Sequence, residues 1–376
     1  MRLSPPHSLA VLGLLFGLSC GAHTEPKDPI GLVAETGVGC YGNNDALTVI
    51  SPWVSATKEL PKDHVVDVKY TVDVITAASV DVVSSATQAF EETRHEGAVV
   101  VQGERNDIRG ALAWSGSTES DARSNTVDLR GETDLFSKNL TIAAQYAVNT
   151  GKLGTVQESP DLWRRRTTQK AGLSATQILG RTTVGGLTYT YTRDAGLLSS
   201  PYRRAPIFPA GADTLTGDLA QWVAERHPDL RNRHAFTGSG RQAVGQHVFL
   251  RLVHRGYFDD WAMRAHTTEA GVAFDVTHGF VFELNNRFHW QSSVGFYRDI
   301  YTVNREFITR DRRLGQLWTE SPGAALRYKG ERLQAYLRGQ LQSTHYKAFT
   351  LIAGEELLPY PDTLAVIGET GLSAAF

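Results

Sequence analysis

The chain ends in LAVIGETGLSAAF, residues 364–376, and this stretch decides the fold. Its apolar side chains recur at every second position up to the terminal Phe376, while Glu369 and Ser373 share the other parity. A two-residue period places alternate side chains on opposite faces of a β-strand. One apolar face toward lipid and one polar face toward a wet lumen is typical of an outer-membrane barrel strand. We expect the terminal ring of Phe376 at the membrane interface, where it also marks the strand for the barrel assembly machinery.

A single alternating strand also occurs at the edge of soluble sheets, so the other segments matter. The alternation recurs over residues 65–76 and 332–343, and again near 107–114, 127–132, 139–149, 187–192 and 280–285. A helix would scatter the charges of these segments around its circumference. A dozen or so such strands, with Gly and aromatic residues on the apolar face, favour a barrel over a sandwich. The predicted lumen-lining residues are Asp67, Lys69, Asp73, Asp128, Arg130, Glu132, Arg332 and Arg338, and Trp114 and Trp261 are predicted at the membrane interface.

The connections between these segments alternate in length. Short ones lie near 103–106, 136–138, 179–181 and 329–331, and long ones at 77–92, 150–166, 195–233, 298–320 and 347–362. Short periplasmic turns and long extracellular loops are the usual asymmetry of outer-membrane barrels. About 14 strands follow residue 65, and residues 47–57 add another. Because bacterial barrels have even strand numbers, we predict an all-β, antiparallel up-and-down transmembrane barrel of about 16 strands, with 14 as the alternative. The barrel is assigned to 45–376, and the segment 23–44 is the candidate for the first strand.

The N-terminus predicts a secretory signal peptide over residues 1–22. Arg2 precedes an apolar run at 9–18 and a small-residue stretch at 19–22, and that run is half the length that a membrane-spanning helix needs. Lipidation at Cys20 is the alternative, weakened because Gly17 stands where an aliphatic residue is usual. After cleavage only Cys40 remains, which excludes an intrachain disulfide and a thiolate metal cluster. We expect no cofactor, and the net charge of −2 without a basic tract gives no reason to expect nucleic acid as a partner.

Several local motifs resemble a domain-of-unknown-function family of predicted bacterial outer-membrane β-barrel proteins. The matching stretches include AASVDVV (77–83), ETRHE (92–96), SPYR (200–203), HPDLR (227–231), YFDDW (257–261), HTTE (266–269), FYRD (296–299) and GEE (354–356). The resemblance implies a porin-like barrel in the Gram-negative outer membrane, in contact with outer-membrane lipid and lipopolysaccharide. It implies no established activity. Genes of this family often lie beside a gene for a small lipoprotein, and the resemblance therefore implies a periplasmic or cell-surface redox lipoprotein as a partner.

Two groups of residues stand out as candidate sites. Asp259 and Asp260, at a strand end, could hold Ca²⁺ through oxygen ligands, but the more ordinary interpretation is a rim turn in which Asp accepts hydrogen bonds. The stretch 195–233 contains Tyr202, Arg203, Arg204 and Arg231 among Pro and Gly. Residues 219–225 are predicted to form helical turns. We predict a loop that narrows the pore or a surface whose arginines bind lipopolysaccharide phosphates, and the more ordinary interpretation is a long extracellular loop without either role.

The functional predictions follow from the barrel. The first is a porin-like channel of unknown cargo. The alternative is a scaffold or sheath for a periplasmic or surface redox lipoprotein. An outer-membrane hydrolase is a distant third, because the chain lacks a Gly-x-Ser-x-Gly elbow and any grouping of nucleophile, base and oxyanion hole. We therefore expect no catalytic residues and no enzymatic activity.

Overall fold

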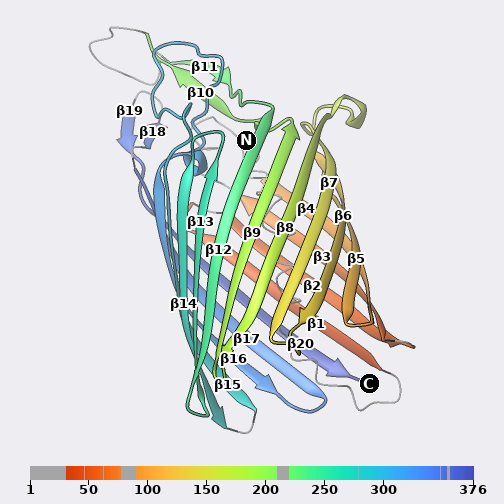
Figure 1. The fold of residues 1–376 in the computed structure, drawn as a ribbon. Helices are drawn as coiled ribbons and strands as arrows, with labels where there is room; N and C mark the ends of the chain where they lie inside the picture. The colour runs from red at the N-terminus through yellow and green to blue at the C-terminus, as the bar shows by residue number, and fades with distance from the viewer. Residues whose placement is uncertain are drawn as a thin grey trace.

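Sixteen antiparallel strands close into one barrel (Figure 1) in the computed structural model, which describes residues 31–45, 47–61, 63–77, 90–209, 220–277, 279–347, 349–353 and 356–376. The last strand pairs with the first, with Ala375 opposite Val33, so the sheet has no edge. The barrel strands are β1 (Leu32–Asn43), β2 (Leu47–Leu60), β3 (His64–Ala77), β4 (Phe90–Arg105), β5 (Ile108–Thr118), β6 (Ala122–Leu135), β7 (Leu140–Leu153), β8 (Arg164–Gly180), β9 (Thr183–Gly196), β12 (Leu230–Val244), β13 (Val248–Asp259), β14 (Arg264–Thr277), β15 (Phe280–Gln291), β16 (Leu317–Lys329), β17 (Leu333–Tyr346) and β20 (Thr363–Ala375).

The predicted strand number of 16 is confirmed, and the alternative of 14 is wrong. Part of the segment 23–44 forms β1, so the barrel begins at Leu32 and not at residue 45. The predicted signal peptide and Cys20 lie outside the described residues.

The two ends of the barrel differ, as the alternating connection lengths predict. Turns of two to four residues join the strands at the end where the chain terminates, which we call the turn end. Connections of up to 33 residues join them at the opposite loop end. Four short strands pair there, β10 (Arg204–Ile207) with β11 (Gln221–Ala224) and β18 (Thr350–Ala353) with β19 (Glu356–Pro359) (Figure 1). In outer-membrane barrels, the end that carries the long loops is the extracellular side.

The outer face of the barrel is apolar and exposed. Leu187 is 71% exposed, Leu129 58% and Val366 55%, and Trp114 lies on the same face of β5 at 47%. A continuous apolar surface of this kind is unfavourable in water and is matched by a hydrocarbon environment. The fold is therefore that of an outer-membrane barrel.

No helix among the described residues is long and apolar enough to cross a membrane. The helices in the described part are three-residue 3₁₀ turns, η1 (Pro160–Leu162) and η3 (Arg312–Leu314). The helical turns predicted for 219–225 are wrong, because Gln221–Ala224 forms β11 and Trp222 pairs with Pro206 of β10. This pairing satisfies backbone groups that a single helical turn would leave without partners.

Candidate functional site

The predicted inward face of β3 lies in the lumen and is held by neighbouring strands. Asp67 accepts a hydrogen bond from Thr57 at 2.7 Å, and the Lys69 ammonium lies 4.5 Å above the Trp53 ring. Asp73 pairs with Arg94 at 2.7 Å. These side chains share one parity in the register of β2, β3 and β4, so the polar faces of three strands meet inside the barrel.

The inward charges of β6 join a second network closer to the turn end. Arg109 donates to Glu132 at 2.6 Å and to Asp134 at 2.8 Å, and Arg130 also pairs with Glu132. Further along the strand, Asp128 accepts from Gln145 at 2.7 Å. Several of these acidic and basic side chains pair with one another, so the net charge of this part of the lumen wall is small.

The two predicted lumen residues at 332 and 338 have different positions. Arg338 lies on the inner face of β17, opposite Glu369 of β20, and lines the wide part of the lumen. Arg332 lies in the turn before β17, so its side chain is not on an inward strand face; its carbonyl accepts a hydrogen bond from Ala375. The parity rule fails at Arg332 because the chain reverses at 330–332 and alternation begins only at Leu333.

Sequence reasoning missed most of the basic wall of the lumen. Arginine and lysine side chains face inward from β8 to β17, and only some have acidic partners. The strand register shows that these residues point inward. Their orientation could not be predicted from the sequence, because polar residues occur at both parities in these strands. These arginine and lysine residues are Arg166, Lys170, Arg231, Arg233, Arg241, Arg251, Arg255, Arg287 and Arg327.

The lumen is hollow and changes width along its axis. A cavity of about 1450 Å³ at the turn end shares Arg241 and Arg251 with a neighbouring cavity of about 690 Å³. It shares Thr237 and Arg255 with a third cavity of about 200 Å³ nearer the loop end. The shared lining residues make the three cavities consecutive parts of one space, which is wide at the turn end and narrow near the loop end.

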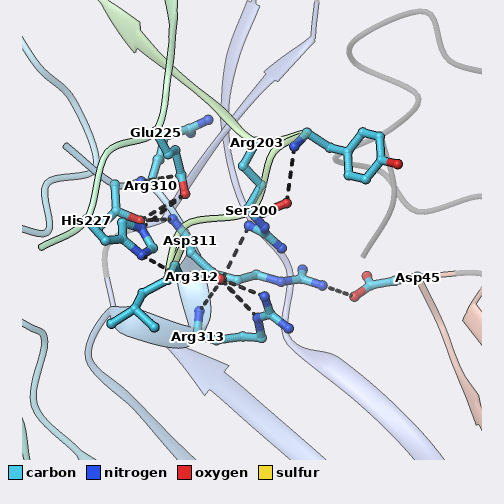
Figure 2. A network of polar contacts seen from close by, with 12 residues as sticks. Asp45, Ser200, Arg203, Glu225, His227, Arg310, Asp311, Arg312 and Arg313 are labelled. Atoms are coloured by element: carbon cyan, nitrogen blue, oxygen red, sulfur yellow. Dashed lines mark hydrogen bonds and ion pairs between the residues drawn. The ribbon is translucent and has the colours of Figure 1, made fainter. Parts of the chain in front are cut away.

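Folded loops narrow the loop end (Figure 2). Arg203, just before β10, pairs with Asp311 at 3.3 Å, and Glu225, just after β11, accepts from the backbone N–H of Arg310 at 2.7 Å. The backbones of Arg226 and Ile308 exchange two hydrogen bonds of 2.9 Å. The described parts of the connection 197–229, which are residues 197–209 and 220–229, therefore pack together with the connection 292–316 at the barrel mouth.

The connection 292–316 is also attached to the inner wall. The amide of Gln291, the last inward residue of β15, donates to the carbonyls of Arg313 and Gly315. The buried guanidinium of Arg312 pairs with Asp45 at 2.8 Å and lies 5.1 Å above the ring of Tyr346. Because Tyr346 is an inward residue of β17, η3 occupies the mouth on the β15–β17, β20 and β1 side. The prediction that 195–233 alone forms the constriction is incomplete.

Asp311 joins the basic side chains of the packed loops at the barrel mouth. It accepts from the Arg313 backbone N–H at 3.0 Å as the N-cap of η3, and it pairs with the side chains of Arg203 and Arg313. Burial opposes the charge of Asp311, but the two guanidinium groups outweigh it and hold the pKa of that carboxyl well below its usual range. The carboxylate therefore stays ionised throughout the physiological range.

The remaining residues of the predicted loop site have separate roles. The Tyr202 hydroxyl donates to Asp121 at 2.9 Å and accepts from the Val156 N–H at 3.0 Å, which ties three connections together. Arg204 is exposed on β10. Arg231 belongs to barrel strand β12, and its Nε donates to Asp259 at 2.8 Å.

The weak metal candidates Asp259 and Asp260 are engaged in hydrogen bonds at a rim turn. Asp259 also accepts from the Tyr257 hydroxyl at 2.7 Å and from the Met263 N–H at 2.9 Å. Asp260 accepts from the backbone and side-chain amides of Asn232 at 3.0 and 2.7 Å. Both carboxylates therefore accept hydrogen bonds at a rim turn, Asp260 through Oδ2.

Trp261 is not at the membrane interface. Its ring is only 7% exposed, packs edge-on against Phe296 with centroids 5.2 Å apart, and lies 4.4 Å below the Arg231 guanidinium. Its indole N–H donates to the Leu230 carbonyl at 2.9 Å. The prediction failed because the turn 260–263 bends inward over the mouth, whereas Trp114 stays on a strand face.

A buried group of carboxylates lies at the β5–β6 connection. Oxygens of Glu92, Glu119 and Asp121 lie within 4.8 Å of one another, and Ser120 donates to Glu92 at 2.6 Å. Burial, followed by the negative charge of Glu92, raises the pKa of Glu119 to about 7. These oxygens are the type that Ca²⁺ prefers, and the group could not be predicted because Glu92 lies on β4, far in sequence from Glu119 and Asp121 in the β5–β6 connection.

Phe376 lies at the turn end with its side chain 54% exposed, and its backbone N–H donates to the Leu32 carbonyl at 2.9 Å. The terminal residue therefore continues the β20–β1 ladder beyond Ala375.

Comparisons with known proteins agree with the fold. A family model described as "Protein of unknown function (DUF3570)" matches residues 154–347, just over half of the chain. No curated protein matches the sequence. Among solved structures, a "Bacterial polysaccharide outer membrane secretin" has a TM-score of 0.51 and 10% identity, with 93% of this chain and 100% of that chain covered. CdiB from Acinetobacter baumannii has a TM-score of 0.51 and 11% identity, with 91% of this chain covered, and the chain spans 60% of its length. An anion-selective porin from Comamonas acidovorans has a TM-score of 0.41 and 8% identity, with 92% and 99% covered. At these identities the likeness concerns the fold alone.

Proposed function

The chain belongs to the DUF3570 family, and from this premise we propose that it is a porin-like channel of the outer membrane for small hydrophilic solutes. The observation that carries the proposal is the continuity of the lumen. Three cavities of about 1450, 690 and 200 Å³ share polar and charged lining residues along the barrel. A wet, charged lumen of graded width suits permeation with selection at the narrow part.

The loops at the mouth set the aperture in this proposal. Helix η3 covers the β15–β17, β20 and β1 side, while the narrow cavity is lined by residues of β5–β9, β12 and β13. Solutes would therefore pass along the β5–β9 wall. The charges of that wall then select among solutes.

Conductance of purified protein in planar lipid bilayers tests the proposal. Stepwise, stable current increments from heat-modifiable, folded protein would support a channel. Silent bilayers, together with a lipoprotein that co-purifies tightly from detergent-solubilised membranes, would replace it with the scaffold function. The charged lining of the lumen supports the channel, because hydrophilic solutes pass through a polar lumen.

A further inference from the structure

Six cationic residues of the described part of the chain line the narrow cavity, and four of them occupy inward positions of their strands. Arg166 and Lys170 extend from β8, Arg233 from β12 and Arg255 from β13, and we call these the lumen cation cluster. In the register, Thr192 of β9 is the neighbour of both Lys170 and Arg233. Thr237 is opposite Arg255. The cations therefore surround a patch of threonine hydroxyl groups.

The positive charge of this cluster is only partly neutralised. Arg233 pairs with Asp194 at 2.7 Å, and Asp194 also accepts from Thr168 at 2.6 Å. Across the described ranges of the chain, the guanidinium groups of Arg166 and Arg255 make no hydrogen bond or ion pair, and the Nε of Arg233 has no partner. Arg233 repels Arg166, Lys170 and Arg255, while Asp194 attracts Arg166 and Asp128 attracts Lys170.

Among the described residues, no carboxylate lines the cavity. Its remaining lining includes hydroxyl and amide groups, such as those of Thr188, Thr190 and Asn149, together with apolar side chains such as Leu153. Like charges in a confined, partly dehydrated space repel one another strongly, so an anion bound between them reduces this electrostatic repulsion. Guanidinium groups bind the oxygens of phosphate and carboxylate in bidentate geometry, and hydroxyl groups supply further donors.

The size of the cavity limits the ligand. Its volume of about 200 Å³ lies below the roughly 300–1,000 Å³ of pockets for drug-sized molecules. A small oxyanion fits within this part of the lumen, whereas a larger solute would extend into the wider cavity that shares Thr237 and Arg255 with it.

We propose that the lumen cation cluster is a binding site for small oxyanions such as inorganic phosphate. The role in permeation rests on the proposed channel function, because such a site would concentrate these anions at the narrowest part of the lumen. Binding itself does not depend on conduction. The two can therefore be tested separately.

Calorimetry of detergent-solubilised wild-type protein with inorganic phosphate tests binding. The double variant Arg166→Gln/Arg255→Gln should weaken phosphate binding about tenfold or more, because it removes two charge-assisted donors without leaving a paired acid behind. Arg327→Gln/Arg338→Gln is the matched control, since it removes the same two charges elsewhere in the same lumen; it should change the affinity less than threefold. Absence of phosphate binding to folded wild-type protein, or equal loss in the control, would overturn the site.

Bilayer recordings separate the site from the channel. Phosphate should reduce the chloride current of the wild-type channel, and the double variant should shift the reversal potential in a KCl gradient toward cation selectivity. Phosphate binding without any conductance would uphold the site and overturn the channel. Conductance with neither phosphate block nor a selectivity shift would uphold the channel and overturn the site. The glutamine variant is informative only if it shows heat-modifiable mobility. If it does not, the site is tested by the phosphate block of the wild-type chloride current and by the Arg166→Lys/Arg255→Lys variant, which keeps the charge.

Discussion

Arg312 donates a hydrogen bond to Asp45 at 2.8 Å although 267 residues separate them in the chain. Asp45 also accepts from the Tyr360 hydroxyl at 2.7 Å and from Thr363 at 3.1 Å. One buried carboxylate in a short connection thus holds the connections 292–316 and 347–362 at the barrel mouth. Closure of the mouth therefore depends on contacts between connections that are distant in sequence.

Substitution of Asp45 should loosen this closure. Asp45→Asn keeps the size of the side chain but leaves the buried Arg312 guanidinium without its counter-charge, which costs about 3–5 kcal/mol for a buried pair. We expect larger and noisier single-channel currents and faster trypsin cleavage within 292–316, with the barrel itself still heat-modifiable.

Asp362→Asn is the control for this change. Asp362 pairs with His345 at the same end of the barrel, but its side chain is 54% exposed, and exposed pairs contribute about 1 kcal/mol or less. It should leave current and cleavage near wild-type values. Equal effects of the two variants would contradict the role assigned to Asp45.

The barrel could be predicted from the sequence because its determinants are local. A strand that crosses a membrane must alternate at every second residue, so segments such as 65–76 and 364–376 carry the signal on their own. The alternation of short and long connections between the strands can also be read from the sequence, without knowing which strands pair. Arg332 marks the limit of this reasoning, because the parity of a strand does not extend into its turn.

The mouth could not be predicted in the same way. Residues 310–313 read Arg-Asp-Arg-Arg, a charge run of the kind that is usually solvated. Arg310, Asp311 and Arg312 are buried because Asp45, Arg203 and Glu225 arrive from two other connections, whereas the Arg313 side chain stays 42% exposed. The burial of Trp261 likewise depends on Phe296 and Arg231, which lie on other elements.

The two tryptophans that were predicted alike should respond differently to truncation. Trp261→Ala removes a buried ring from a packed cluster and should destabilise the mouth by about 3–5 kcal/mol. Trp114→Ala removes an outward ring on β5 that is 47% exposed, so little packing within the protein is lost. Thermal unfolding followed by circular dichroism in detergent, with loop cleavage by trypsin, measures both. A larger effect for Trp114→Ala would contradict the buried position of Trp261.

The stability of the protein should fall as the pH rises from about 5 to 8. Glu119 has a folded-state pKa of about 7, above the value near 4.3 of an unperturbed Glu. Between these values the folded state retains a proton that the unfolded state has lost, so raising the pH favours unfolding until Glu119 ionises. The difference in the free energy of unfolding is about 3 kcal/mol.

Denaturant titrations at pH 5 and pH 8 measure this dependence. Glu119→Gln should flatten the profile and make the protein more stable than wild type at pH 8. Glu104→Gln, at an exposed position near the turn end, is the matched control and should keep the wild-type slope. A Glu119→Gln profile parallel to wild type would show that another group causes the dependence.

Deletion of Phe376 should impair assembly more than pore properties. The residue extends the β20–β1 seam through its hydrogen bond to Leu32, and its exposed ring ends the strand at which the barrel closes. We expect a severalfold lower level of folded protein in the outer-membrane fraction, measured by immunoblotting of heated and unheated samples, with unchanged conductance for the molecules that do insert. Phe136→Ala is the control, because Phe136 is an exposed aromatic residue at the same end but in the β6–β7 turn, and it should assemble normally. Because the seam is the last pairing to form in a closed sheet, normal outer-membrane levels after deletion of Phe376 would mean that β20 is recognised through its other outward residues.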